Sequence, residues 1–116
     1  MKTAPKQDLY LKIDGYERDI FEIVDNIKKY ILSEECPFLV IDISKLNIID
    51  ATKIGAMCST YHFSKYPDGN ITWKVNDIET LHSIRQLKLK TVSIELNPRT
   101  NKTIEYIEKK YRSNIF

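Results

Sequence analysis

The sequence is poor in glycine and cysteine, and it contains no long apolar run. Only three glycines occur among 116 residues and they are not clustered, which argues against a glycine-rich phosphate-binding loop. No apolar run approaches the roughly 20 residues of a membrane-spanning helix, and segment 1–8 lacks the apolar part of a secretory signal. We therefore expect a cytoplasmic protein without membrane insertion. Charges are interspersed, and a net charge of +2 argues against nucleic acid as the main partner.

The two cysteines do not form a recognisable site. Cys36 and Cys58 make no CxxC pair, and no histidine stands at metal-ligand spacing from either of them. Cys58 and His62 are four residues apart, which places both on one side of a helix, but no third group that would orient the histidine is evident. We interpret both thiols as small buried side chains and predict no metal, no cofactor and no catalytic residue.

Strand-like and helix-like patterns alternate along the whole chain. Apolar residues alternate with polar ones, or follow one another without interruption, in four strand-like segments: 9–13, 38–43, 71–75 and 92–96. Apolar residues recur at helical spacing in four further segments: 17–33, 50–65, 76–87 and 98–115. Asn76, followed by Glu79, is expected to cap the third of these helices. This βαβαβαβα order predicts a single α/β domain over residues 1–116, with a mainly parallel sheet and right-handed crossovers.

Three of the four predicted strands keep polar side chains on one face, whereas segment 38–43 is almost entirely apolar and is typical of a central strand. A sheet enclosed between two helix layers would be apolar on both faces. We therefore expect the helices to lie mainly on one face. The side chains expected on the opposite face are Tyr10, Lys12, Thr72, Lys74, Ser93 and Glu95.

Asp50 stands where the second helix is expected to begin. As an N-cap, its carboxylate would accept a hydrogen bond from the backbone N–H of Thr52 or Lys53. A helix that starts at the end of a strand presents unpaired N–H groups and a partial positive charge, at the edge where open α/β sheets bind ligands and partners. Asp42 flanks the same loop, so an acid–base pair is the alternative. We favour a helix cap for Asp50 and hydrogen bonds to backbone N–H groups for Asp42.

The same strand, turn and helix resemble the signature region of the STAS domain family, which covers anti-sigma factor antagonists and the cytosolic domains of sulphate transporters. In that family an apolar strand ends in a Leu-Asp-Leu-Ser-like phrase, and Asp-Ser-Ser-Gly-Leu-Gly then opens a helix. The corresponding phrases here are Ile41-Asp-Ile-Ser44 and Asp50-Ala-Thr-Lys-Ile-Gly55, and segment 13–19 resembles the junction before the family's first helix. The resemblance covers roughly residues 9–96 and implies a β-α superhelix of four βα units.

The resemblance implies a bacterial regulatory domain that binds proteins and is not an enzyme. Its implied partners are an anti-sigma kinase, another STAS protein in a signalling assembly, or the ATPase of a lipid-transport system. The serine that is phosphorylated in anti-sigma antagonists is Ala51 here, which has no hydroxyl, so Thr52 is the remaining candidate for phosphorylation. Lys53 stands where the family has a glycine. The residues assigned to partner binding by resemblance are Asn47, Asp50, Ala51, Thr52, Lys53 and Gly55.

Two other functions stay open at this point. A helix start such as the one near Asp50 can hold an anion, so a small-molecule or anion-binding sensor is one alternative. The STAS subunit of a lipid-transport ABC system is another that the resemblance allows. An enzyme is the least supported class, because the sequence does not indicate a converging set of catalytic groups.

Overall fold

Seven elements alternate along the part of the chain that the structure describes. The computed structural model describes residues 9–14 and 19–96. Its elements are β1 (Leu9–Lys12), α1 (Ile20–Ser33), β2 (Phe38–Asp42), α2 (Ile48–Lys65), β3 (Asn70–Val75), α3 (Ile78–Arg85) and β4 (Val92–Leu96). The predicted alternation of strands and helices is confirmed over this range. The helix predicted over 98–115 lies outside the described residues.

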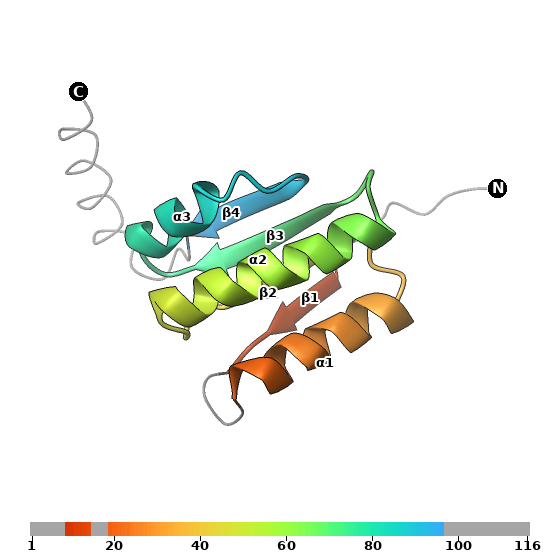
Figure 1. Ribbon diagram of the computed structural model, residues 1–116, viewed down its shortest axis with the longest axis horizontal. Helices are drawn as coiled ribbons and strands as arrows, with labels where there is room; N and C mark the ends of the chain where they lie inside the picture. The colour runs from red at the N-terminus through yellow and green to blue at the C-terminus, as the bar shows by residue number, and fades with distance from the viewer. Residues whose placement is uncertain (1–8, 15–18, 97–116) are drawn as a thin grey trace.

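The four strands form one sheet in the order β1-β2-β3-β4, and all three neighbouring pairs are parallel. A helix connects each strand to the next, because parallel neighbours need a crossover rather than a tight turn. Figure 1 shows α1, α2 and α3 lying over one face of this sheet. The predicted α/β fold with a parallel sheet and helices on one side is therefore confirmed for the described residues.

The hydrophobic core lies between the sheet and the helix layer. Strand side chains alternate between the two faces, so Leu39, Ile41 and Trp73 point into the core from neighbouring strands. The indole N–H of Trp73 donates to the Ser59 hydroxyl at 2.8 Å, which gives a buried donor its partner. The buried apolar residues of α1 follow helical spacing and are Ile23, Val24, Ile27 and Ile31.

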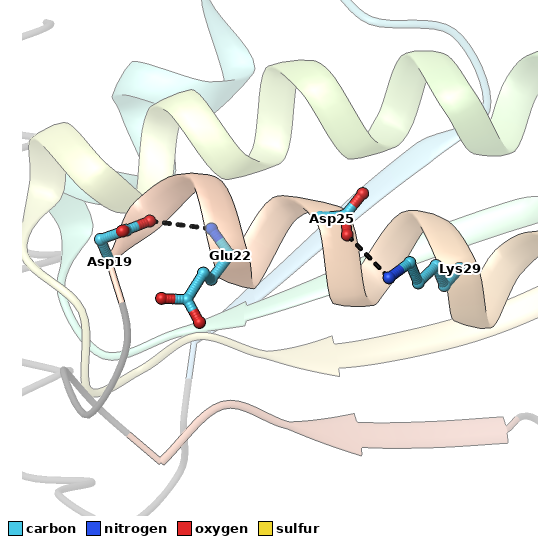
Figure 2. Close-up of polar contacts among 4 residues, drawn as sticks. All are labelled: Asp19, Glu22, Asp25 and Lys29. Carbon is cyan, nitrogen blue, oxygen red and sulfur yellow. Dashed lines mark hydrogen bonds and ion pairs between the residues drawn. The ribbon is translucent and has the colours of Figure 1, made fainter.

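Each helix begins at an N-cap side chain. Asp19 accepts the Glu22 N–H at 2.9 Å at the start of α1, and Figure 2 shows this bond beside the surface ion pair of Lys29 and Asp25. The predicted N-caps of the next two helices were each wrong in position. Asn47, not Asp50, caps α2, and Asp77, not Asn76, caps α3.

Lys65, the last residue of α2, and Tyr66, its C-cap, hold the carboxyl end of α1. The Lys65 ammonium donates to the carbonyls of Ile31 and Leu32 at 2.8 and 3.0 Å. The Tyr66 hydroxyl donates to the carbonyl of Glu34 at 2.9 Å. The last carbonyls of a helix have no partner within the helix, and the negative end of its dipole favours a nearby cation. These bonds therefore fix the chain where it turns from α1 toward β2.

His62 occupies a fully buried place beside this junction. Its Nε2 lies 2.8 Å from the carbonyl oxygen of Cys36, and its Nδ1 has no hydrogen-bond partner. Because a carbonyl only accepts, Nε2 carries the proton, and Nδ1 has no acceptor that would favour a second one. Burial lowers the pKa of His62 and is the largest cause. The hydrogen bond to the Cys36 carbonyl opposes this, and the nearby charge of Lys65 adds to the lowering of the pKa. The imidazole therefore acts as a structural hydrogen-bond donor in the core.

Candidate functional site

The loop between β2 and α2 is short and is fixed at both ends. The Ile43 N–H donates to the carbonyl of Lys74 at 2.9 Å, which continues the sheet pairing beyond β2. The Leu46 N–H closes a turn on the Ile43 carbonyl at 3.1 Å, and the Leu46 side chain is buried in the core. The loop thus presents the amino terminus of α2 at the carboxyl edge of the sheet on a rigid support.

Asp42 stabilises the beginning of this loop. Its carboxylate accepts the Ser44 N–H at 2.9 Å and the Tyr10 hydroxyl at 3.0 Å. Burial by itself raises the pKa of Asp42, but hydrogen bonds from Ser44 and Tyr10 and the charge of Lys12 outweigh burial and lower the pKa below its usual value. The prediction that Asp42 bonds backbone N–H groups at the strand end is confirmed. Tyr10 was not predicted as its partner, because nothing in the sequence pattern indicates a contact across 32 residues.

The first turn of α2 is closed by Asn47 and carries Asp50. The Asn47 side-chain oxygen accepts the Asp50 N–H at 2.8 Å. Asp50 is therefore the third residue of the helix rather than its cap, and its half-buried carboxylate lies in the first turn, where the helix dipole favours a negative charge. An anion approaching this helix start would compete with both the Asn47 oxygen and the Asp50 carboxylate.

Two of the predicted partner-binding residues face inward. Ala51 is 0% exposed and belongs to the hydrophobic core. Gly55 is also buried, and a Cβ placed there would lie 3.4 Å from the side chain of Ile84 on α3. These two small residues let α2 pack closely on the sheet and on α3. They shape the site from beneath, so a partner would contact the neighbouring residues rather than these side chains.

Thr52 and Lys53 reach the surface to different degrees. Thr52 is half-buried, and its hydroxyl donates to the Ser83 hydroxyl of α3 at 2.9 Å. Lys53 is exposed. The Thr52 hydroxyl is therefore engaged in joining two helices, and a phosphoryl group could be attached to it only after this bond is broken. Lys53 leaves a cation at the accessible side of the second helical turn.

Exposed isoleucines complete this end of α2, and sequence analysis missed them. Ile49 is 63% exposed and Ile48 is also exposed. Ile49 lies off the buried face of α2, which includes Ala51, Ile54 and Cys58. Ile48 lies in line with buried Gly55 and Ser59 and is 37% exposed because it stands at the open end of the helix. The helix starts three residues earlier than predicted, which places both isoleucines in its first turn. Its phase then turns Ile49 outward, and the position at the helix end leaves Ile48 accessible. We call the group of accessible residues the α2 surface: Asn47, Ile48, Ile49, Asp50, Thr52 and Lys53.

The alternative of a cysteine nucleophile is not supported by the geometry. Burial raises the pKa of the Cys58 thiol to about 12, so the thiol stays protonated. His62, which sequence spacing placed beside it, uses its protonated nitrogen to bond the Cys36 carbonyl. An acid–base pair of Asp42 and Asp50 is not supported either. Asp42 accepts hydrogen bonds from the Ser44 N–H and the Tyr10 hydroxyl, and both bonds favour its charged form.

Metal sites, membrane spans and surface hollows are the other features that bear on function. Within residues 9–14 and 19–96, no three His, Cys, Asp or Glu side chains come together as a metal ion would require. No helix in those ranges has the length and apolar character to cross a membrane. Two surface hollows of about 250 and 210 Å³ share Lys88 and Leu89 of the connection between α3 and β4, away from the α2 surface.

Comparison of the chain with protein-family models, with curated proteins and with solved structures found no match in any of the three.

Proposed function

We propose that this chain is a non-catalytic regulatory domain that binds a protein partner through the α2 surface. The observation that carries the proposal is the pair of exposed isoleucines, Ile48 and Ile49, at the first turn of a helix held rigidly at the carboxyl edge of the sheet. Exposed apolar side chains at a fixed helix end suit protein binding, since covering them removes apolar area from water.

The magnitude is sufficient for a specific contact. Burying an isoleucine side chain completely contributes roughly 1.5–3 kcal/mol, so covering the exposed part of Ile49 contributes about 1–2 kcal/mol. Lys53 adds a charge at the rim, which favours a partner with an acidic group there and speeds encounter more than it raises affinity. Asn47 keeps the helix start ordered before binding, so less conformational entropy is lost on association.

The resemblance to STAS domains supports the same surface. It suggests an anti-sigma kinase, a STAS assembly or a transport ATPase as the partner. Ala51 lacks the hydroxyl that the family's phosphorylation switch uses, and Thr52 donates its hydroxyl to Ser83. We therefore propose a binder that is not switched by phosphorylation at the family's usual position.

Affinity capture with matched variants tests this function. Bacterial lysate is passed over the immobilised wild-type chain, an Ile49→Asp variant and a Leu32→Asp control, and captured proteins are quantified by mass spectrometry. Leu32 is a fair control because it is 60% exposed, close to the 63% of Ile49, but lies at the far end of α1. We expect a partner that is retained by wild type and the control and reduced at least about tenfold by Ile49→Asp, since about 1.4 kcal/mol is a factor of ten.

The same capture can contradict the proposal. If Ile49→Asp, shown to be folded by circular dichroism, captures the same proteins in the same amounts as wild type, the α2 surface is not the binding site. A partner lost equally from Ile49→Asp and Leu32→Asp would also contradict it. Intact-mass measurement after incubation with ATP and a captured kinase tests the remaining part, because a stoichiometric phosphate on Thr52 would refute a binder without a switch there.

A further inference from the structure

The sheet face opposite the helices carries a row of four charged residues with alternating sign. The strand register aligns Lys12 with Asp42, Asp42 with Lys74, and Lys74 with Glu95. All four side chains point to the same face, because residues paired in register in a parallel sheet share their orientation. The row therefore reads positive, negative, positive, negative from β1 to β4.

The middle of this face is covered by side chains of the sheet itself. The Tyr10 hydroxyl reaches Asp42 at 3.0 Å, and the Lys74 ammonium lies 5.5 Å from the centre of the Tyr10 ring. Tyr10 on β1 and Lys74 on β3 thus meet over β2, which explains why Asp42 and Val40 are buried on a face without a described helix. Tyr10 itself stays 52% exposed. The centre of the face therefore offers an aromatic ring fixed in place.

The two ends of the row keep their charges accessible. Lys12 and Glu95 are exposed. Among the described residues, Lys29 and Asp25 on α1 form an ion pair closer than 4.0 Å. No member of the row forms such a pair with another described residue. Neighbouring opposite charges in the row still attract one another weakly across strands. Lys12 and Glu95, each with a neighbour on one side alone, retain the most capacity for an external partner.

From this row we infer that the occupant of the open sheet face is a second copy of the chain. Consider a two-fold axis that runs parallel to the strands, between β2 and β3. It places the second copy face to face with the first and reverses the order of its row. Because the row has four charges of alternating sign, each charge then stands opposite a charge of the other sign. Lys12 then faces Glu95 of the second copy at each end of the interface. At the centre, the buried Asp42 lies behind Tyr10, on the side of Lys74 of the second copy. The open sheet face is therefore complementary in charge to itself under this rotation, and an isologous dimer requires such a self-complementary surface.

The dimer should be weak. Four strands about 4.8 Å apart, with about five residues each at about 3.3 Å, give a face of roughly 250–300 Å² in projection. This is well below the roughly 800 Å² per partner that standard stable interfaces bury. Two sheets can pack face to face with their strands nearly aligned, so the geometry itself is ordinary. We expect association at roughly 0.1–1 mM rather than at nanomolar concentration.

This inference is independent of the proposed function. The open sheet face and the α2 surface lie on different sides of the molecule, since α2 covers the opposite face of the sheet (Figure 1). The chain can therefore pair with itself and still present the α2 surface. Failure of either proposal leaves the other in place.

Charge exchange between Lys12 and Glu95 tests the pairing. Sedimentation velocity is run over a concentration series on wild type, Lys12→Glu, Glu95→Lys, the double variant Lys12→Glu/Glu95→Lys, and an equimolar mixture of the two single variants. Each single variant places like charges opposite one another at both ends of the interface. The double variant and the mixture place opposite charges there again. Lys29→Glu on α1 is the control, because it reverses a charge on the helix side.

We expect wild type and the control to shift from a 13.6 kDa monomer toward twice that mass as concentration rises. Each single variant should require at least about tenfold higher concentration, and both the mixture and the double variant should recover the wild-type behaviour. The inference is overturned if wild type stays monomeric throughout, if the folded single variants associate as wild type does, or if the mixture does not recover association. In the first case the row serves only to keep the open face soluble.

Discussion

His62 should make the stability of this fold depend on pH. The ring donates from Nε2 to the Cys36 carbonyl and leaves Nδ1 buried without a partner. Protonation would add a charge at Nδ1, where no acceptor is present and where Lys65 already contributes a positive charge. The fold therefore favours the neutral ring, and burial, the larger cause, together with Lys65 lowers the pKa of His62 below its ordinary value of 6.5.

The sign and the size of the effect follow from proton linkage. Because the pKa is lower in the folded state, the unfolded state binds more protons below pH 6.5, and the free energy of unfolding falls as the pH is lowered. The contribution is fully present above that pH and is lost progressively until the pH passes the folded-state pKa. One proton gives a slope of at most about 1.4 kcal/mol per pH unit, or at most about 2 kcal/mol between pH 6.5 and pH 5.

Urea unfolding at a series of pH values measures this slope. The experiment compares wild type with His62→Gln, whose side-chain amide can still donate to the Cys36 carbonyl but does not titrate. His82→Gln on α3 is the matched control, because it removes the other histidine. We expect a slope between about pH 6.5 and pH 5 in wild type and in the control, and a flatter curve in His62→Gln.

Two results would refute this reasoning. The first is a wild-type stability that does not change between about pH 7 and pH 5, because a ring kept neutral in the folded state requires stability to fall as the unfolded chain takes up a proton. The second is an unchanged slope in His62→Gln together with a flat curve in His82→Gln, which would assign the proton to the other histidine. Asp42 does not affect the comparison, because its folded-state pKa is lowered and its contribution to stability is lost only as the pH falls below its ordinary pKa of 3.8.

Three further predictions concern other parts of the fold. Asn47→Ala should lower the free energy of unfolding by about 1 kcal/mol by removing the α2 cap, whereas Asn47→Asp should retain most of it; equal losses in urea unfolding would argue against capping. Gly69→Ala should cost roughly 2–4 kcal/mol, because its Cβ would collide with the backbone carbonyl of Pro37; a thermal melt within about 2 °C of wild type would contradict this. Cys36 and Cys58 should resist a thiol-specific reagent until urea is added, since burial raises the pKa of both thiols; rapid labelling of the native protein would contradict their burial.

The sequence predicts the order of elements well because the two periodicities differ clearly. Leu9 and Leu11 alternate with polar residues, whereas the apolar residues of α1 recur every three or four positions. Such patterns report burial directly, and burial is what holds this fold together. The polar strand positions likewise predicted the open face of the sheet, on which Tyr10 and Lys12 lie.

Helix starts were predicted less well, for a local reason. Asn47 and Asp50 are both good N-caps, and so are Asn76 and Asp77. The choice depends on backbone dihedrals and on which N–H group lies within reach, and neither is visible in a residue pattern. The three-residue error at α2 hid Ile48 and Ile49, the residues that now carry the proposed function.

Long-range contacts were beyond prediction from the pattern. Tyr10 meets Asp42 across two strands, and Thr52 meets Ser83 across two helices. Each contact depends on the exact register of elements that are more than 30 residues apart. Sequence spacing placed His62 beside Cys58, whereas in the structure the Nε2 of His62 bonds the carbonyl of Cys36. Pairing of polar side chains thus became clear only when the strands and helices were placed together.

Site-specific photo-cross-linking tests the central claim, partner binding at the α2 surface, most directly. A photoreactive amino acid replaces Ile49 in one sample and Leu32 in another, and each chain is expressed in bacteria, irradiated and analysed by mass spectrometry. We expect a discrete adduct with one protein at position 49 and none with that protein at position 32. An adduct of equal yield at both positions, or adducts only at position 32, would contradict docking through α2.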